Sequence, residues 1–170
     1  VRSRVGRGST FSFTARLGEC AQGTSRGYDD MFEFGRGETE PIDAFVLIVE
    51  DNTINRTVAA RMLERLGVTV LSARDGTEAV AMAMAHRFDL ILMDCQMPVM
   101  DGYEATARIR AFEASQTDSE HQPRLPIIAL TANAMDGDRE RCLAAGMDDY
   151  LRKPFKMAEL GRALRLWVRA

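Results

Sequence analysis

Three runs of apolar residues each end directly on an acidic or hydroxyl residue. The runs are Phe45–Val49, Leu90–Met93 and Ile127–Leu130, and the residues that follow them are Glu50 and Asp51, Asp94, and Thr131. A weaker run around Tyr150 leads to Lys153. Short, near-continuous apolar runs are typical of parallel strands buried on both faces. Because ligands bind beyond the carboxyl ends of such strands, we expect these polar side chains to converge on one site.

Segments of helical periodicity alternate with these strand-like runs from Asp43 onward. The pattern predicts helices over Thr53–Leu66, Thr77–Ala85, residues 102–113, Met135–Ala145 and Lys156–Val168, and two further strands over Val68–Leu71 and Asp148–Arg152. The polar segment Ala114–Arg124 predicts a loop. Five β-α units in succession predict an α/β fold, a doubly wound five-stranded parallel sheet with helices on both faces, as in flavodoxin-like proteins.

The chain divides into three parts. Residues 18–42 are rich in Gly, Ser, Thr and charge without a sustained period, which predicts a flexible linker. Upstream, in residues 1–17, Gly6-Arg7-Gly8 leads into Ser9–Thr14, where Phe11 and Phe13 alternate with hydroxyl residues as in a half-buried strand. Residues 43–170 form the predicted domain. A first residue of Val1 instead of Met leads us to expect a piece of a longer protein.

Composition narrows the function classes. The net charge is −3 and arginine is interspersed with acidic residues, so nucleic acid is not an expected partner. No apolar stretch reaches membrane-spanning length, so we expect no direct membrane contact. The three cysteines, Cys20, Cys95 and Cys142, form no metal-binding or disulfide pattern, which indicates a reducing, cytoplasmic location.

The acidic residues at the strand ends indicate a metal and a nucleophile. Glu50 and Asp51 are adjacent carboxylates, which repel each other in a crevice unless a cation is bound there. Mg²⁺ suits such a site, because it takes oxygen ligands from one or two carboxylates and from phosphate. Asp94 ends an apolar run, and a carboxylate there can act as a nucleophile toward phosphorus to give an aspartyl-phosphate. The sequence therefore predicts Mg²⁺-assisted phosphoryl chemistry.

A hydroxyl and an ammonium complete the predicted site. The Thr131 hydroxyl can bond a phosphoryl oxygen, and the small neighbour Ala132 leaves room for phosphate to enter. Lysine is rare in this arginine-rich chain and occurs only at Lys153 and Lys156. A compact ammonium can approach a single phosphate oxygen where a planar guanidinium does not fit, so Lys153 is the expected phosphate partner. Pro154 fixes the turn that aims it, through a cis bond if the turn requires one.

These motifs closely resemble the receiver domain of two-component signalling proteins. The resemblance covers about Ala44–Val168 and rests on four motifs in order: Glu50-Asp51-Asn52, the run Met93–Gly102, Leu130-Thr131-Ala132 and Lys153-Pro154-Phe155. It implies that Asp94 is the phosphoacceptor, and that Glu50, Asp51, Asp94 and the Gln96 backbone carbonyl hold Mg²⁺. It also implies that Thr131 and Lys153 sense the phosphate, that Tyr150 is the aromatic switch, and that Gln96 and Asn133 set the phosphoryl lifetime.

The resemblance also implies partners and a conformational switch. The donor would be a phospho-His, in a kinase core or a partner kinase, and the output would be relay to a histidine phosphotransfer protein or control of the attached kinase. Phosphorylation adds about −1.5 to −2 charge units, which would draw Thr131 inward and bias the surface made by the Met135–Ala145 helix, the Asp148–Arg152 strand and the Lys156–Val168 helix.

Residues 3–17 resemble the last glycine box and strand of histidine-kinase ATP-binding domains, through Gly6-x-Gly8-Ser9-Thr10-Phe11. The implied parent is a hybrid sensor histidine kinase. Such a parent can be anchored in the inner membrane, with this region in the cytoplasm. The chain at hand lacks the rest of the ATP site, so we do not expect it to act as a kinase alone.

Two alternatives remain open on the sequence. A magnesium-dependent phosphatase of the haloacid-dehalogenase type also uses Asp, Thr and Lys, but it needs a second Asp where this chain has Gln96. A receiver-like interaction module that is never phosphorylated would lack one or more site residues, whereas this sequence has them all.

Overall fold

The computed structural model describes residues 2–4, 8–10, 40–116, 124–132 and 136–168. After Glu40 the elements alternate strictly: β3 (Phe45–Val49), α1 (Thr53–Arg65), β4 (Thr69–Ala73), α2 (Gly76–Ala85), β5 (Leu90–Asp94), α3 (Gly102–Ser115), β6 (Ile127–Thr131), α4 (Asp136–Ala144), β7 (Asp149–Arg152) and α5 (Met157–Trp167). The strands pair in parallel in the order β4-β3-β5-β6-β7. The predicted doubly wound sheet is confirmed.

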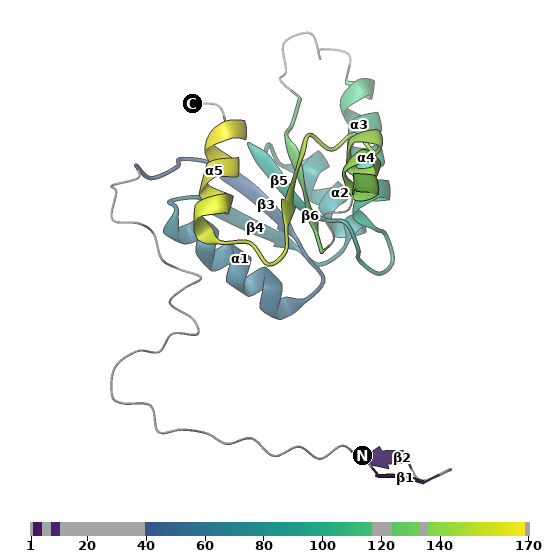
Figure 1. Cartoon of the computed structure of the whole chain (residues 1–170). Helices are drawn as coiled ribbons and strands as arrows, with labels where there is room; N and C mark the ends of the chain where they lie inside the picture. Colours follow the sequence, from purple (N-terminus) through teal and green to yellow (C-terminus); the bar gives the residue numbers. More distant parts are fainter. Residues whose placement is uncertain (1, 5–7, 11–39, 117–123, 133–135, 169–170) are drawn as a thin grey trace, which may run out of the picture.

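Helices cover both faces of this sheet (Figure 1). On one face α1 and α5 pack over side chains such as Val46, Ile48 and Leu92. On the other face α2, α3 and α4 pack over Leu47, Ile91 and their neighbours. The strands β3, β5 and β6 alternate between the two clusters and are almost completely buried, which explains their near-continuous apolar runs.

The domain starts slightly earlier than predicted. Ile42, which the sequence analysis placed in the linker, is only 8% exposed and packs in the core beside α1. Its backbone N–H donates to the Leu66 carbonyl at 2.8 Å. The packed domain therefore includes Ile42, one residue before the predicted boundary at 43, because an isoleucine beside an apolar helix end is stabilised by burial.

The predicted loop at Ala114–Arg124 also starts later than expected, because α3 continues to Ser115; residues 117–123 lie outside the described part. Near the amino terminus, β1 (Arg2–Arg4) and β2 (Gly8–Thr10) form an antiparallel pair of their own. The strand predicted over residues 9–14 is described only as far as Thr10, and most of the predicted linker lies outside the described residues.

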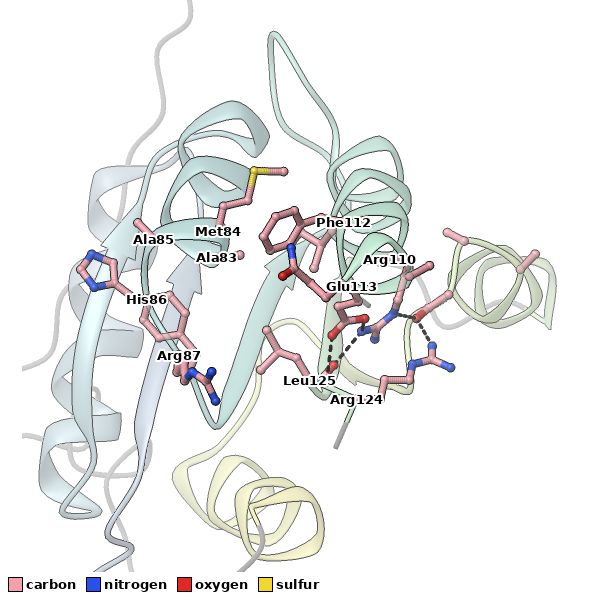
Figure 2. Close-up of a pocket in the computed structure, with 17 residues that line it drawn as sticks. Ala83, Met84, Ala85, His86, Arg87, Arg110, Phe112, Glu113, Arg124 and Leu125 are labelled. Carbon is pink, nitrogen blue, oxygen red and sulfur yellow. Dashed lines mark hydrogen bonds and ion pairs between the residues drawn. The ribbon is translucent and has the colours of Figure 1, made fainter. Parts of the chain in front are cut away.

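A cavity of about 940 Å³ opens at the amino-terminal edge of the sheet, between the carboxyl-terminal ends of α2, α3 and α4 (Figure 2). Arg110 of α3 braces its wall, since its guanidinium donates to the carbonyls of Gly146 at 2.9 Å and Leu125 at 2.8 Å, and to Asp148 at 2.7 Å. Of the predicted site residues that the structure describes, none lines this cavity. Among the helices described, none is long and apolar enough to cross a bilayer.

Candidate functional site

A smaller cavity, of about 310 Å³, lies beyond the carboxyl ends of the strands. It is lined by Glu50, Asp51, Asn52, Asn55, Asp94, Cys95, Gln96, Leu130, Ala132 and Lys153. Five of the predicted site residues are in this set, and they come from the ends of β3, β5 and β7. The structure thus brings together, at one edge of the sheet, the acids and the lysine that the sequence analysis placed there.

Lys153 is held between two buried acids. Its Nζ donates to Asp94 Oδ2 at 2.7 Å and also makes a short hydrogen bond to Glu50 Oε2. The Glu50 and Asp94 side chains are only 3% and 9% exposed, whereas that of Lys153 is 21% exposed. One ammonium therefore balances two carboxylates from different strands, and the cluster keeps a net negative charge.

The two partners of this ion pair respond differently to burial. Burial raises the pKa of the Asp94 carboxyl above its usual value, and the hydrogen bonds from Lys153 and from the Gln96 backbone N–H oppose this without cancelling it. Burial lowers the pKa of Lys153, but its hydrogen bonds to Asp94 and Glu50 outweigh that and leave the pKa raised. Lys153 is thus firmly cationic, while the Asp94 carboxylate is destabilised by loss of water.

A third carboxylate gives the cluster the character of a cation site. Glu50, Asp51 and Asp94 each offer an oxygen, and these oxygens lie within 4.8 Å of one another. Asp51 is exposed, so a hydrated cation can approach from its side. Oxygen ligands from one or two carboxylates, with water in the remaining positions, match what Mg²⁺ prefers. The residues present therefore fit a divalent cation.

Two residues of α1 that the sequence analysis did not assign hold Glu50 in place. Asn55 donates from Nδ2 to Glu50 Oε1 at 3.1 Å, and Arg56 donates to the Glu50 backbone carbonyl at 2.6 Å. Asn52 begins the helix as its N-cap, accepting from the N–H groups of Ile54 and Asn55. Asn before a helical run is a sequence signal for such a cap, whereas no spacing rule predicts the contacts of Asn55 and Arg56.

Backbone geometry fixes the other side of the cavity. The Lys153–Pro154 bond is cis, as the sequence analysis allowed, and Lys153 N–H donates to the Thr131 carbonyl at 2.7 Å. Gly102 begins α3 directly against β5, and a Cβ built there would lie 2.1 Å from the Asp94 carbonyl oxygen. Only glycine leaves room for this approach.

The remaining predicted residues lie beside the cavity or outside the described part. Thr131 ends β6 and is 6% exposed, but it does not line the cavity. Tyr150 pairs with Ala129 in the β6–β7 register and is 38% exposed, so its ring is at the surface. Asn133 lies outside the described residues.

The fold and this edge of the sheet define the receiver class of α/β proteins, and comparisons with known proteins agree. Residues 46–165 match the response regulator receiver domain family. Hybrid signal transduction histidine kinase K of Dictyostelium discoideum is 38% identical over 162 residues, which cover 95% of this chain and 13% of that protein. This chain belongs to the response regulator receiver domain family, and it spans a small part of the curated relative that it matches.

Two solved structures are similar over the same region. The receiver domain of sensor histidine kinase PA1611 from Pseudomonas aeruginosa PAO1, with a magnesium ion coordinated in its active-site cleft, is 54% identical with a TM-score of 0.65; the match covers 75% of this chain and 98% of that one. The co-crystal structure of the Saccharomyces cerevisiae histidine phosphotransfer protein Ypd1 with the receiver domain of Ssk1 gives 36% identity and a TM-score of 0.70, covering 74% and 89%.

The charge imbalance of the site predicts opposite effects of two substitutions on stability. A carboxyl whose pKa is raised by folding contributes stability only at low pH, and that contribution is lost as pH rises through its pKa. In EDTA at pH 7, Asp94→Asn should therefore raise the melting temperature, because the neutral amide removes a buried charge. Lys153→Met should lower the free energy of unfolding by about 3 kcal/mol, at the low end for a buried pair because Lys153 is partly exposed, since Glu50 and Asp94 lose their counter-charge.

Thermal melts followed by circular dichroism measure both effects. Glu64→Gln on the exposed side of α1 is the matched control and should change stability by less than about 0.5 kcal/mol. A lower melting temperature for Asp94→Asn than for the unsubstituted protein would contradict this account of the site.

Proposed function

We propose that Asp94 of this receiver domain accepts a phosphoryl group from a phospho-His, with Mg²⁺ bound in the acidic cluster. The observation that carries the proposal is the convergence of Asp94, Glu50, Asp51 and Lys153 on one small cavity at the carboxyl edge of the sheet. The magnesium ion in the similar PA1611 receiver supports the choice of cation.

The proposed metal ligands are Glu50, Asp51, Asp94 and the Gln96 backbone carbonyl. When bound, Mg²⁺ supplies positive charge that offsets the charge building up on the phosphoryl oxygens. Glu50 is already fixed by Asn55 and Arg56, so this ligand needs little reorganisation to bind. Asp51, being exposed, lies where water molecules that remain on the ion can face solvent.

The chemistry assigned to the chain is a single transfer. A carboxylate oxygen of Asp94 attacks phosphorus, the bond from phosphorus to the donor imidazole nitrogen breaks, and an aspartyl-phosphate forms. Lys153 already contacts Asp94, so its ammonium can pass to a phosphoryl oxygen without leaving the cavity. The Thr131 hydroxyl is the proposed second phosphate partner. Gln96 and Asn133 are the residues proposed to control how readily water attacks the product.

Intact-mass measurement after incubation with acetyl phosphate and Mg²⁺ tests this proposal. The unsubstituted protein should gain one phosphoryl group, and Asp94→Asn should gain none. EDTA should abolish the gain. Asp51→Asn should reduce the labelling rate on the order of tenfold or more, because a metal ligand is lost.

Glu64→Gln, an acid of α1 away from the cavity, is the matched control and should label normally. An unchanged mass under conditions that label a known receiver would support the unphosphorylated interaction module instead. Sustained hydrolysis of a simple phosphate ester would favour the haloacid-dehalogenase-type phosphatase. We do not expect this result, because that class needs an Asp as general acid where this chain has Gln96.

We further propose that phosphorylation changes the surface made by α4, β7 and α5. Thr131 lies at the end of β6, and the Tyr150 ring lies at the surface on the neighbouring strand. If Thr131 moves toward the phosphate, the vacated space can receive the Tyr150 ring. Trp167 of α5 donates from Nε1 to Asp149 of β7 at 2.9 Å, so it joins two elements of this surface.

Trp167 is the single tryptophan of the chain and provides a direct readout of this switch. Acetyl phosphate with Mg²⁺ should change its fluorescence emission, because the environment of the β7–α5 contact changes. Thr131→Ala should still gain the phosphoryl mass but show less than about half of the emission change, since the link from phosphate to β6 is lost. Equal emission changes in both proteins would rule out Thr131 as this link.

A histidine phosphotransfer protein is the proposed partner, as the Ypd1–Ssk1 co-crystal structure suggests by analogy. Two exposed apolar side chains lie close in sequence to residues that line the cavity. Ile54, 73% exposed, comes shortly after Asn52, and Val99, 89% exposed, comes shortly after Gln96. Apolar groups this exposed at the rim of a site suit contact with a protein donor.

Changing Ile54 should separate protein donors from small ones. With phosphorylated Ypd1 as donor, Ile54→Ala should slow transfer about tenfold, which corresponds to about 1.4 kcal/mol of lost contact. With acetyl phosphate the rate should not change. Met84→Ala, exposed near the opposite edge of the sheet, is the control and should transfer normally with both donors. Equal slowing of Ile54→Ala with both donors would place the effect on chemistry instead of docking.

The parent is proposed to be a hybrid sensor histidine kinase, cytoplasmic in this region. Residues 1–17 would be the end of its ATP-binding domain, and the residues from 18 up to the packed Ile42 would be a linker. The match to kinase K covers 95% of this chain, so it reaches well upstream of residue 40. The described β1–β2 pair fits a strand ending of that kind. Kinase activity would reside elsewhere in the parent.

A further inference from the structure

Two buried thiols meet directly behind the proposed phosphoacceptor. Cys95 follows Asp94 at the end of β5, and Cys142 lies on α4, 47 residues further along the chain. Their sulfur atoms are 3.7 Å apart, and the residues are only 2% and 1% exposed. They are the free cysteines among the described residues.

The thiols join three elements. Tyr103 of α3 packs against the same core cluster as both cysteines, and the guanidinium of Arg141 on α4 lies 4.9 Å from the centre of the Tyr103 ring. The pair therefore connects α4 to the residue that follows Asp94, whose phosphorylation is proposed to change the surface that includes α4.

We propose that Cys95 and Cys142 are an oxidisable dithiol, and that their disulfide ties α4 to β5 and slows phosphoryl acceptance at Asp94. The second half of this inference rests on the proposed function. A disulfide needs sulfur atoms about 2.0 Å apart, so the present pair must close by about 1.7 Å.

The site cavity offers a route for a small oxidant. Cys95 is among the residues that line the cavity beside Asp94, and a neutral peroxide can enter that cavity without repulsion from the acids. The Cys95 sulfur attacks one peroxide oxygen, the O–O bond breaks, and the thiol proton leaves with hydroxide as water. Cys142 sulfur then attacks the resulting sulfenic acid, the S–O bond breaks, and a second water leaves. Two thiols are oxidised and one peroxide is reduced to two waters.

The closure strains the site because β5 has no room to move. Cys95 N–H donates to the Leu130 carbonyl at 3.1 Å, and the Cys95 carbonyl accepts from Gly102 N–H at 3.3 Å. The Asp94 carbonyl is packed against Gly102. A disulfide therefore either pulls α4 onto β5 and holds it there, or displaces Asp94 from Lys153. Both outcomes oppose a transfer that requires an aligned Asp94 and a mobile α4.

The experiment uses the full chain with Cys20→Ser, so that Cys95 and Cys142 are the remaining cysteines. After hydrogen peroxide treatment, a thiol-alkylating reagent is added under denaturing conditions and the intact mass is measured. We expect protein with neither thiol alkylated and a Cys95–Cys142 peptide on digestion. Labelling by acetyl phosphate and Mg²⁺ should then slow at least threefold, and dithiothreitol should restore it.

Cys142→Ala in the same background is the matched control. This variant keeps all ten methionines, so methionine oxidation affects it in the same way. It cannot form the disulfide, so its labelling rate should be neither slowed by peroxide nor restored by dithiothreitol. Two results would show that the inference is wrong. In the first, both thiols remain alkylatable after a treatment that oxidises a small dithiol; in the second, the disulfide forms without changing the labelling rate. In either case the pair serves only as core packing. A reduced protein that is never labelled would instead refute the proposed function.

Discussion

The structure depends on one ammonium placed between two buried carboxylates from different strands. Glu50 follows β3 and Asp94 ends β5, and both accept a hydrogen bond from Lys153, which follows β7. Removing Lys153 would leave both acids buried without their counter-charge, so this one side chain ties together the ends of β3, β5 and β7. Three carboxylates, those of Glu50, Asp94 and the exposed Asp51, face the single positive charge of the lysine. This excess of negative charge favours binding of a divalent cation in the cleft.

Parallel register turns this constraint into a site. Asp94 pairs with Leu130 across β5 and β6, and Thr131 pairs with Arg152 across β6 and β7, so residues far apart in the chain end at one edge. In an antiparallel sheet with this order of strands, β3 and β6 would run opposite to β5, so Glu50 and Thr131 would lie at the other edge from Asp94. The larger cavity at the amino-terminal edge has no such convergence, because there the described strands begin instead of ending.

The central strands and the site at their ends could be predicted from the sequence. A strand buried on both faces excludes polar side chains along its length, so its apolar run marks where it begins and ends. The runs of β3 and β6 were predicted to within one residue for that reason. The edge strand β4 was predicted at 68–71 and found at Thr69–Ala73, because its partly exposed residues give a weaker signal. The contacts of Asn55 with Glu50, and of Cys95 with Cys142, were not predicted, since they depend on how a helix lies over the sheet and on no spacing in the chain.

The same packing indicates which helices can move when Asp94 is phosphorylated. Gly102 holds α3 so closely against the Asp94 carbonyl that this side of β5 cannot yield. On the other side Lys153 is tied through its backbone to Thr131, so a change in what Lys153 contacts acts directly on the end of β6. The chain after Thr131 leads into α4, which contacts the residue after β5 through the Cys95–Cys142 pair. We therefore expect a phosphoryl group on Asp94 to act more on the α4 side of the domain than on the α3 side, because α3 begins in close contact with the Asp94 backbone.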